Sequence, residues 1–275
     1  MTILVTGASG NAGGAVVRAL AANGVPAKAL LRRERELPPG IDLLQGDLNE
    51  PQTFAAGLEG VSGIFLLSGY AGTEELLAKA AAAGVERVVL LSSSSVVGTT
   101  TDNAIAAYHL QTERAVEASG LEWTFLRPNT FMSNTLRWLD QVRAGDEITV
   151  QYPEVPISTI HPDDIADVAV RALTEDGHAG TAYRLTGPVA LRPAEQVGIL
   201  GEVLGRPLRA VELSREESHA ELLAAMPEAY ANAIDGFFGA GVVDETTVND
   251  TVETVTGHPA RTLRKWAEEN AARFA

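Results

Sequence analysis

Hydroxyl and imidazole side chains gather after one strongly apolar run, and groups of these types can transfer protons or orient a carbonyl. Four serines, Ser92 to Ser95, directly follow the run Arg87–Leu91, and Tyr108 and His109 come further along. We predict that Ser93, Tyr108 and His109 are catalytic, with His109 donating a proton or holding a sugar hydroxyl. The alternatives are serines that satisfy loop backbone and a His109 that bonds between helices.

The tyrosine of this group has no lysine to assist it. A tyrosine has an unperturbed pKa of about 10, so it needs a nearby cation to act as an acid at neutral pH. Short-chain reductases supply that cation through a Tyr-x-x-x-Lys pair. Counted from Tyr108 the lysine position is Thr112, and counted back from Ser119-Gly120 it is His109. The sequence therefore argues against a tyrosine acid.

A glycine-rich loop near the N-terminus predicts a phosphate-binding turn. The stretch Gly7-Ala-Ser-Gly10-Asn-Ala-Gly13 follows an apolar strand pattern and opens a helical pattern. Glycines let the backbone approach a pyrophosphate, and the helix N-terminus offers N–H groups to the anion. The alternative is an ordinary glycine-rich loop between a strand and a helix. The predicted contacts here are Gly7, Ser9, Gly10, Asn11, Ala12 and Gly13.

Two arginines predict which dinucleotide this loop would hold. NAD-binding domains carry an acidic residue about 20 positions beyond the glycines, for the ribose hydroxyls. Arg32 and Arg33 occupy that neighbourhood here, and arginine can pair with a 2′-phosphate. We therefore predict NADP(H) over NAD(H), with Arg32 closest to the strand end. The alternative is two solvated surface charges, screened by Glu34 and Glu36.

Further cofactor contacts are predicted where later strands end, because ligands of parallel sheets bind at the carboxyl ends of the strands. Asp47 and Leu48 follow the third strand, where an adenine ring would lie, although Asp47 could instead cap a turn. The remaining predicted contacts belong to the nicotinamide side and are Leu67, Ser68, Ser92, Pro128, Asn129 and Phe131.

Short apolar runs alternate with helical patterns through the first half of the chain, which predicts a Rossmann-type, doubly wound α/β fold with a parallel sheet. The predicted strands there are Ile3–Thr6, Ala27–Leu31, Leu43–Gln45, Gly63–Leu67, Arg87–Leu91 and Trp123–Arg127. We expect an NAD(P)-binding domain at 1–150 and a smaller α/β substrate lobe at 151–275. A strand near 182–186 is expected to rejoin the first sheet. Pro51–Leu58 and Arg215–Phe238 are expected to be helical, and Ser158–Ile160 a short strand.

Composition describes a soluble globular protein and excludes several functions. Of 275 residues, 45% are hydrophobic and 21% are charged, and the net charge of −15 disfavours nucleic acid and anionic membranes as partners. The chain has no cysteine, which excludes disulfides and thiolate sites. We expect no signal peptide and no membrane span, and hence a cytoplasmic protein. A homodimer is compatible with the sequence, which does not fix the oligomeric state.

Metal chemistry is not indicated by the histidines. The five of them are spread along the chain without the spacing of metal ligands, and we expect no metal site. They are His109, His161, His178, His219 and His258.

Several of these motifs together resemble the NmrA-like family, a branch of the atypical short-chain dehydrogenases, and the resemblance covers nearly the whole chain. It rests on the Gly7–Gly13 loop, Gly46-Asp47-Leu48, His109-x-x-x-Glu113, Ser119–Pro128, Phe131-Met132-x-Asn134, Asp163–Ala166 and Thr256–Thr262. The set is also similar to the type 2 NADPH quinone oxidoreductases, which share the His-x-x-x-Glu helix and lack the Tyr–Lys pair. His161 departs from the family pattern, because many members carry an acidic residue at this position.

The resemblance implies a Rossmann cofactor domain, a variable C-terminal lobe and NAD(P) binding. The first hypothesis is an NADPH-dependent oxidoreductase acting on a quinone or similar conjugated carbonyl. Hydride delivery to a quinone yields a stabilised phenolate, so a strong enzymic acid is less necessary. The second is a non-catalytic nucleotide sensor that reports redox state to a protein partner. The third is a tailoring enzyme acting on an aromatic secondary metabolite.

Overall fold

The computed structural model describes residues 1–99 and 101–275, which fold as two compact units. The first unit comprises Met1–Ser93, Tyr108–Pro128 and Pro162–Arg184, and the second comprises Ser94–Ala107, Asn129–His161 and Leu185–Ala275. This division differs from the expected single boundary after residue 150. Helix α5, Pro162–Thr174, returns to the first unit and packs against α1, Asn11–Ala22. In addition, Ser94–Ala107 and Asn129–His161 belong to the second unit.

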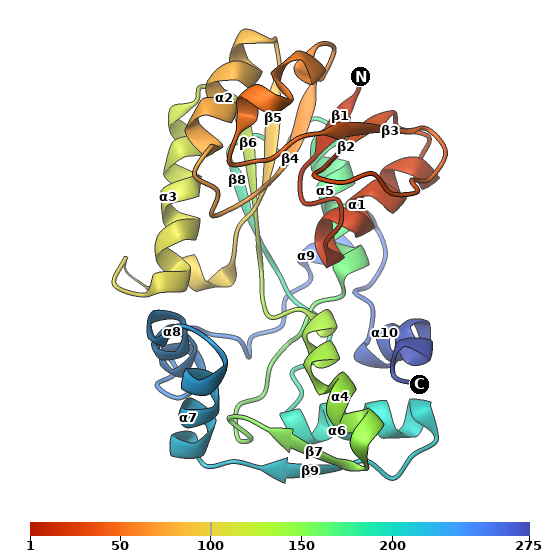
Figure 1. Cartoon of the computed structure of the whole chain (residues 1–275), viewed down its shortest axis with the longest axis vertical. Helices are drawn as coiled ribbons and strands as arrows, with labels where there is room; N and C mark the ends of the chain where they lie inside the picture. The colour runs from red at the N-terminus through yellow and green to blue at the C-terminus, as the bar shows by residue number, and fades with distance from the viewer. Residues whose placement is uncertain (100) are drawn as a thin grey trace. The chain divides into compact units, whose positions relative to one another are not determined.

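A seven-stranded sheet in the order β3-β2-β1-β4-β5-β6-β8 forms the centre of the first unit (Figure 1). Its strands are β1 Ile3–Val5, β2 Ala27–Leu31, β3 Ile41–Gln45, β4 Gly63–Leu67, β5 Arg87–Leu91, β6 Glu122–Pro128 and β8 Thr181–Leu185. The pairs from β3 across to β6 are parallel, and β1 lies between β2 and β4. The strand order therefore reverses at β1, and the predicted Rossmann-type fold and the return of the 182–186 strand are confirmed.

Helices cover both faces of this sheet, as the near-continuous apolar strands require. On one face α2, Thr73–Ala82, and α3, Ala104–Ala118, pack on a core of strand residues that includes Leu4, Leu66 and Leu90. On the other face α5 contacts β4, β5 and β6 and lies beside α1. Figure 1 shows the two helix pairs on opposite sides of the strands.

The second unit has its own core and its own small sheet. Its elements are η3 Ser94–Val96, η4 Met132–Trp138, α4 Leu139–Ala144, β7 Glu147–Val150, α6 Pro193–Leu204, β9 Arg209–Glu212, α7 Arg215–Ala225, α8 Glu228–Phe238, α9 Thr251–Thr256, α10 Leu263–Asn270 and η5 Ala271–Arg273. Strands β7 and β9 pair in parallel. Trp138 and Trp266 are fully buried in a cluster that joins α4, α6 and α10.

Three predicted elements differ from the structure. Pro51–Leu58 forms two 3₁₀ turns instead of one helix. The segment Arg215–Phe238 is two helices, because Pro227 lacks a backbone N–H and starts the second one. Ser158–Ile160 is not a strand, because within this described segment Ile160 alone pairs with another strand-like residue, in an isolated bridge to Phe131. Within residues 1–99 and 101–275, no helix has the length and apolar character needed to span a membrane.

Candidate functional site

The glycine loop after β1 is shaped by close backbone approaches. Gly7 has a φ of +61°, and a Cβ added there would overlap the side chain of Leu67 at the end of β4. A Cβ on Gly13 would lie 2.8 Å from the carbonyl oxygen of Thr6 and closer still to that of Gly7. Glycine at these two positions therefore lets α1 start directly against the strand end, as in dinucleotide-binding turns.

The N-terminus of α1 is arranged to receive an anion. Gly10 is the N-cap residue, and no side chain caps the helix there. Asn11, Ala12 and Gly13 form its first turn, which contains no acidic residue. Because the first N–H groups of a helix have no partner within the helix and lie at the positive end of its dipole, this turn favours a phosphate.

A cleft beside the loop brings several of the predicted cofactor residues together. It is lined by Gly7, Ser9, Leu30, Leu31, Arg32, Gly46, Asp47, Leu48, Asn49 and Tyr70. Asp47 also has the structural role considered above, because its Oδ1 accepts hydrogen bonds from the backbone N and Nδ2 of Asn49. Sequence reasoning missed Asn49 and Tyr70, because nothing in their local pattern distinguishes them from other loop residues.

A second hollow continues from the first at the end of β2 and is rich in arginine. Its lining comprises Ser9, Leu31, Arg32, Arg33, Glu34 and Arg35. Three guanidinium side chains against one carboxylate give it a positive local charge in a strongly acidic protein. Arg35 was not predicted, although it belongs to the same run of charges. The residue types and charge of this hollow match those that bind a phosphate on a ribose.

The loop after β4 is tied to helix α3. Ser68 Oγ donates to the carbonyl of Leu91, and the backbone N–H of Gly69 donates to Thr112 Oγ1 at 3.2 Å. The ring of Tyr108 lies over Gly69, where an added Cβ would be 3.1 Å from its Cδ2. Thr112, the lysine position counted from Tyr108, is buried, and its hydroxyl donates to the Tyr108 carbonyl. Tyr108 therefore has a structural threonine where a lysine would activate it.

The first serine after β5 is held by a buried ion pair. Ser92 Oγ donates to Glu113 Oε1 at 2.6 Å. Arg127 on β6 donates to both oxygens of the same carboxylate, from Nε at 2.9 Å and from Nη2 at 2.7 Å. Glu113 is buried, so these three donors offset the cost of removing its charge from water. Ser93, the next residue, is half-buried.

His109 is an electrically neutral, unsatisfied group. Burial lowers the pKa of its imidazole to about 4, so the ring is uncharged near neutral pH. Its Nδ1 is buried and has no hydrogen-bond partner in the part of the chain that the structure describes. The ring packs 4.2 Å from that of Tyr108, centroid to centroid. A neutral imidazole is a poor proton donor, so the arrangement favours the sugar-holding role over the acid role.

The predicted residues after β6 lie in a braced loop. Pro128 is the last residue of β6 in the first unit, and Asn129 and Phe131 belong to the second unit. The buried side chain of Asn129 donates from Nδ2 to Ser158 Oγ at 2.9 Å. Phe131 is half-buried. Asn129 thus has a bracing role within the second unit.

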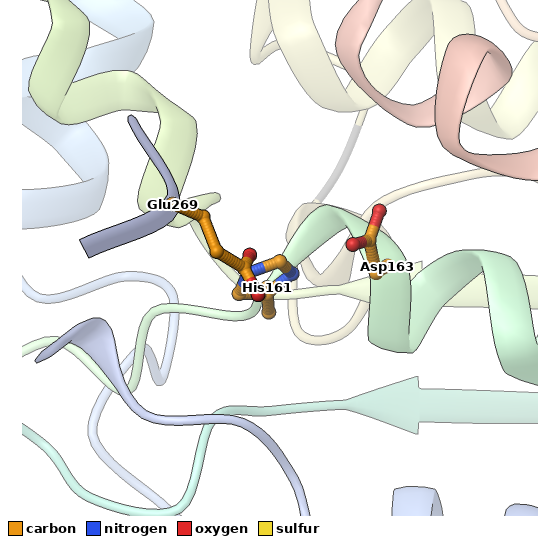
Figure 2. A group of neighbouring side chains, drawn as sticks. All are labelled: His161, Asp163 and Glu269. Atoms are coloured by element: carbon orange, nitrogen blue, oxygen red, sulfur yellow. The ribbon is translucent and has the colours of Figure 1, made fainter. Parts of the chain in front are cut away.

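His161 in the second unit is paired with a carboxylate. Figure 2 shows its imidazole against Glu269 of α10, with 3.1 Å between Nε2 and Oε2. Glu269 also accepts from Lys265 at 3.2 Å. Asp163, drawn in the same figure, belongs to the first unit, where Arg18 donates to it at 3.1 Å. His161 therefore has an acidic partner from a distant part of the sequence.

Comparison with known proteins finds an NAD(P)H-binding family model and two reductases of similar sequence. The chain matches a family model described as NAD(P)H-binding over residues 7–176. It is 38% identical over 283 residues, 99% of each protein, to the (4-alkanoyl-5-oxo-2,5-dihydrofuran-3-yl)methyl phosphate reductase of Streptomyces griseus subsp. griseus. It is 36% identical over 285 residues, again 99% of each protein, to the NAD(P)H azoreductase of Xenophilus azovorans.

A solved structure shows the same fold. An NADPH-dependent quinone oxidoreductase of Escherichia coli, in complex with NADPH, matches with a TM-score of 0.79 at 24% identity. The match covers 98% of this chain and 99% of that one.

Proposed function

This chain belongs to the NAD(P)H-binding family and is an oxidoreductase, and we propose that its donor is NADPH and its acceptor a conjugated compound such as a quinone or a conjugated carbonyl. The observation that carries the choice of donor is the arginine-rich hollow at the end of β2. Arg32 lines both this hollow and the adjoining cleft, so one guanidinium would bridge the two. An acidic residue in that place would instead repel a 2′-phosphate.

The residues present fit a dinucleotide along the carboxyl ends of the first strands. Gly7, Gly10 and Gly13 would admit the pyrophosphate to the uncapped N-terminus of α1. Leu48 and Asp47 would border the adenine, and Arg32 and its neighbours would hold the 2′-phosphate. When bound, NADPH supplies a hydride from its dihydronicotinamide ring.

On the nicotinamide side, the half-buried ring of His109 would hydrogen-bond a ribose hydroxyl or the acceptor. Ser92 can contribute only as an acceptor, because its proton is donated to Glu113. Ser93 and Tyr108 would supply the remaining hydroxyl groups. Leu67, Ser68, Pro128, Asn129 and Phe131 complete the proposed contacts at the ends of β4 and β6.

The proposed acceptor class follows from the weakness of the acids in this set. Neither a Tyr–Lys pair nor a charged His109 is present to protonate a developing alkoxide. Hydride addition to a conjugated acceptor spreads the negative charge over the product and lessens that need. The names of two relatives fit this class, one describing a dihydrofuran ring with alkanoyl and oxo groups and the other an azoreductase.

The test measures how fast the purified native chain oxidises NADPH in the presence of different acceptors. A small quinone, an azo dye and a 4-alkanoyl-5-oxo-dihydrofuran are each added while the nicotinamide absorbance is followed, and saturated ketones serve as the control acceptors. We expect rapid oxidation of NADPH with at least one conjugated acceptor and none with the ketones. Tight binding of NADPH without oxidation by any acceptor would favour a nucleotide sensor and contradict the proposal.

A further inference from the structure

A buried glutamate in the second unit connects two loops that follow strands of the main sheet. Glu245 is only 7% exposed. Its Oε1 accepts from Ser94 Oγ and its Oε2 from the backbone N of Thr130, each at 2.7 Å. A buried carboxylate requires such charge-assisted bonds, since burial without them is costly. The side chain therefore joins the segment after β5 to the segment after β6.

The bond to Thr130 fixes the backbone on which Phe131 is mounted. Ile160 donates its N–H to the Thr130 carbonyl, and Met132 donates its N–H to the Ile160 carbonyl, both at 2.9 Å. These two bonds form the bridge between Phe131 and Ile160. The N–H of Thr130 points away from that bridge and is taken by Glu245. The half-buried ring of Phe131 thus starts from a backbone held on both sides.

The backbone of Glu245 makes a separate attachment that does not depend on its carboxylate. Its carbonyl accepts from Ser158 N at 2.8 Å and from Ser158 Oγ at 3.0 Å. Ser158 Oγ in turn accepts from the Asn129 side chain. A substitution of the Glu245 side chain would therefore leave this brace in place while removing the links to Ser94 and Thr130.

We propose that Glu245 is a positioning residue for the nicotinamide half of the cofactor, acting through Thr130 and Phe131 on one side and Ser94 on the other. This role rests on the proposed function, in which the residues after β5 and β6 face the reacting end of NADPH. Ligands of parallel α/β sheets bind at such strand ends, so loops held there decide how the ligand is oriented. The adenosine half is assigned to residues 7–49 and Tyr70, which belong to the first unit, whereas Glu245 and the two residues that it links belong to the second.

The experiment compares Glu245→Met, which has similar length but no acceptor, with the conservative Glu245→Gln. The glutamine amide can still accept from Thr130 through its oxygen and donate to Ser94 through its nitrogen. Glu253→Met is the matched control, since Glu253 is an exposed acid on α9. Affinities are measured for NADPH and for adenosine 2′,5′-bisphosphate, together with the nicotinamide fluorescence of the bound NADPH.

We expect Glu245→Met, which loses the hydrogen bonds to Ser94 and Thr130, to bind NADPH about tenfold more weakly. The nicotinamide fluorescence of the bound NADPH should change, and the affinity for adenosine 2′,5′-bisphosphate should not. Glu245→Gln and Glu253→Met should match the native chain. Equal weakening of both ligands, or no change in NADPH binding, would overturn the role. If the Met variant does not fold, Ser94→Ala decides, and native NADPH binding by that variant would also overturn it. Failure of the native chain to bind NADPH would instead overturn the proposed cofactor, and this role with it.

Discussion

The hydroxyl of Ser92 lies 2.6 Å from Glu113 Oε1 and donates its single proton to that carboxylate. Ser92 can therefore present only lone pairs to a ligand. Glu113 is in turn held by the guanidinium of Arg127, so one buried ion pair sets the direction of the first serine.

We predict that Glu113→Gln destabilises the fold by about 2 kcal/mol, because it leaves Arg127 without its charged partner in a largely buried place. Chemical denaturation measures the free energy of unfolding. Glu117→Gln makes the same change on an exposed face of α3 and should cost little. Equal stabilities of the two variants would show that the ion pair contributes nothing to the fold.

A glycine substitution should separate the cofactor loop from ordinary helical glycines. Gly13→Ala would force a methyl group against backbone carbonyls, and we expect a loss of about 1 to 3 kcal/mol and of most NADPH affinity. Gly198→Ala in α6 meets no atom within 4 Å and should stabilise the chain by up to about 1 kcal/mol. Thermal unfolding and NADPH titration check both. Native affinity in Gly13→Ala would refute the predicted phosphate turn.

The charge of Arg32 should decide between the two nicotinamide dinucleotides. We expect Arg32→Glu to weaken NADPH binding by more than about tenfold while NADH binding changes little, because only NADPH carries the 2′-phosphate. Titrations at low and moderate salt measure both affinities. Arg114→Glu makes the same charge change on an exposed face of α3 and is the control. A parallel loss for NADH would assign Arg32 to some other contact.

The buried imidazole of His109 should give the stability a defined pH dependence. Its folded pKa is about 4 against an ordinary 6.5, so between these values the unfolded chain binds a proton that the folded chain does not. Stability should therefore rise by roughly 2 kcal/mol from pH 4 to pH 6.5 and show no contribution from His109 above that range. Denaturant midpoints of the native chain and His109→Gln measure this. The same slope in both proteins would show that another group is responsible.

Much of the first unit can be predicted from the sequence, because its strands are continuous apolar runs between turn signals. The bounds of β2, β4 and β5 match the predicted Ala27–Leu31, Gly63–Leu67 and Arg87–Leu91. The return of α5 beside α1 could not be predicted, since nothing local to Pro162–Thr174 tells which unit its apolar face will meet.

The polar links of the site could not be predicted from spacing. Glu245 and Ser94 are 151 residues apart, and neither lies in a sequence motif that predicts a contact with the other. The orphaned state of His109 is likewise a property of packing, because the same His-x-x-x-Glu spacing on an exposed helix would leave the ring solvated.

The most direct test of the account is the fate of a deuterium label placed at the transferable C4 position of NADPH. The native chain is incubated with this donor and a 4-alkanoyl-5-oxo-dihydrofuran acceptor, and the product is examined by mass spectrometry. Direct hydride transfer predicts a product that carries the deuterium on a ring carbon, with stoichiometric oxidation of NADPH. NADPH that binds tightly and stays reduced, with unlabelled acceptor recovered unchanged, would contradict the proposed reductase.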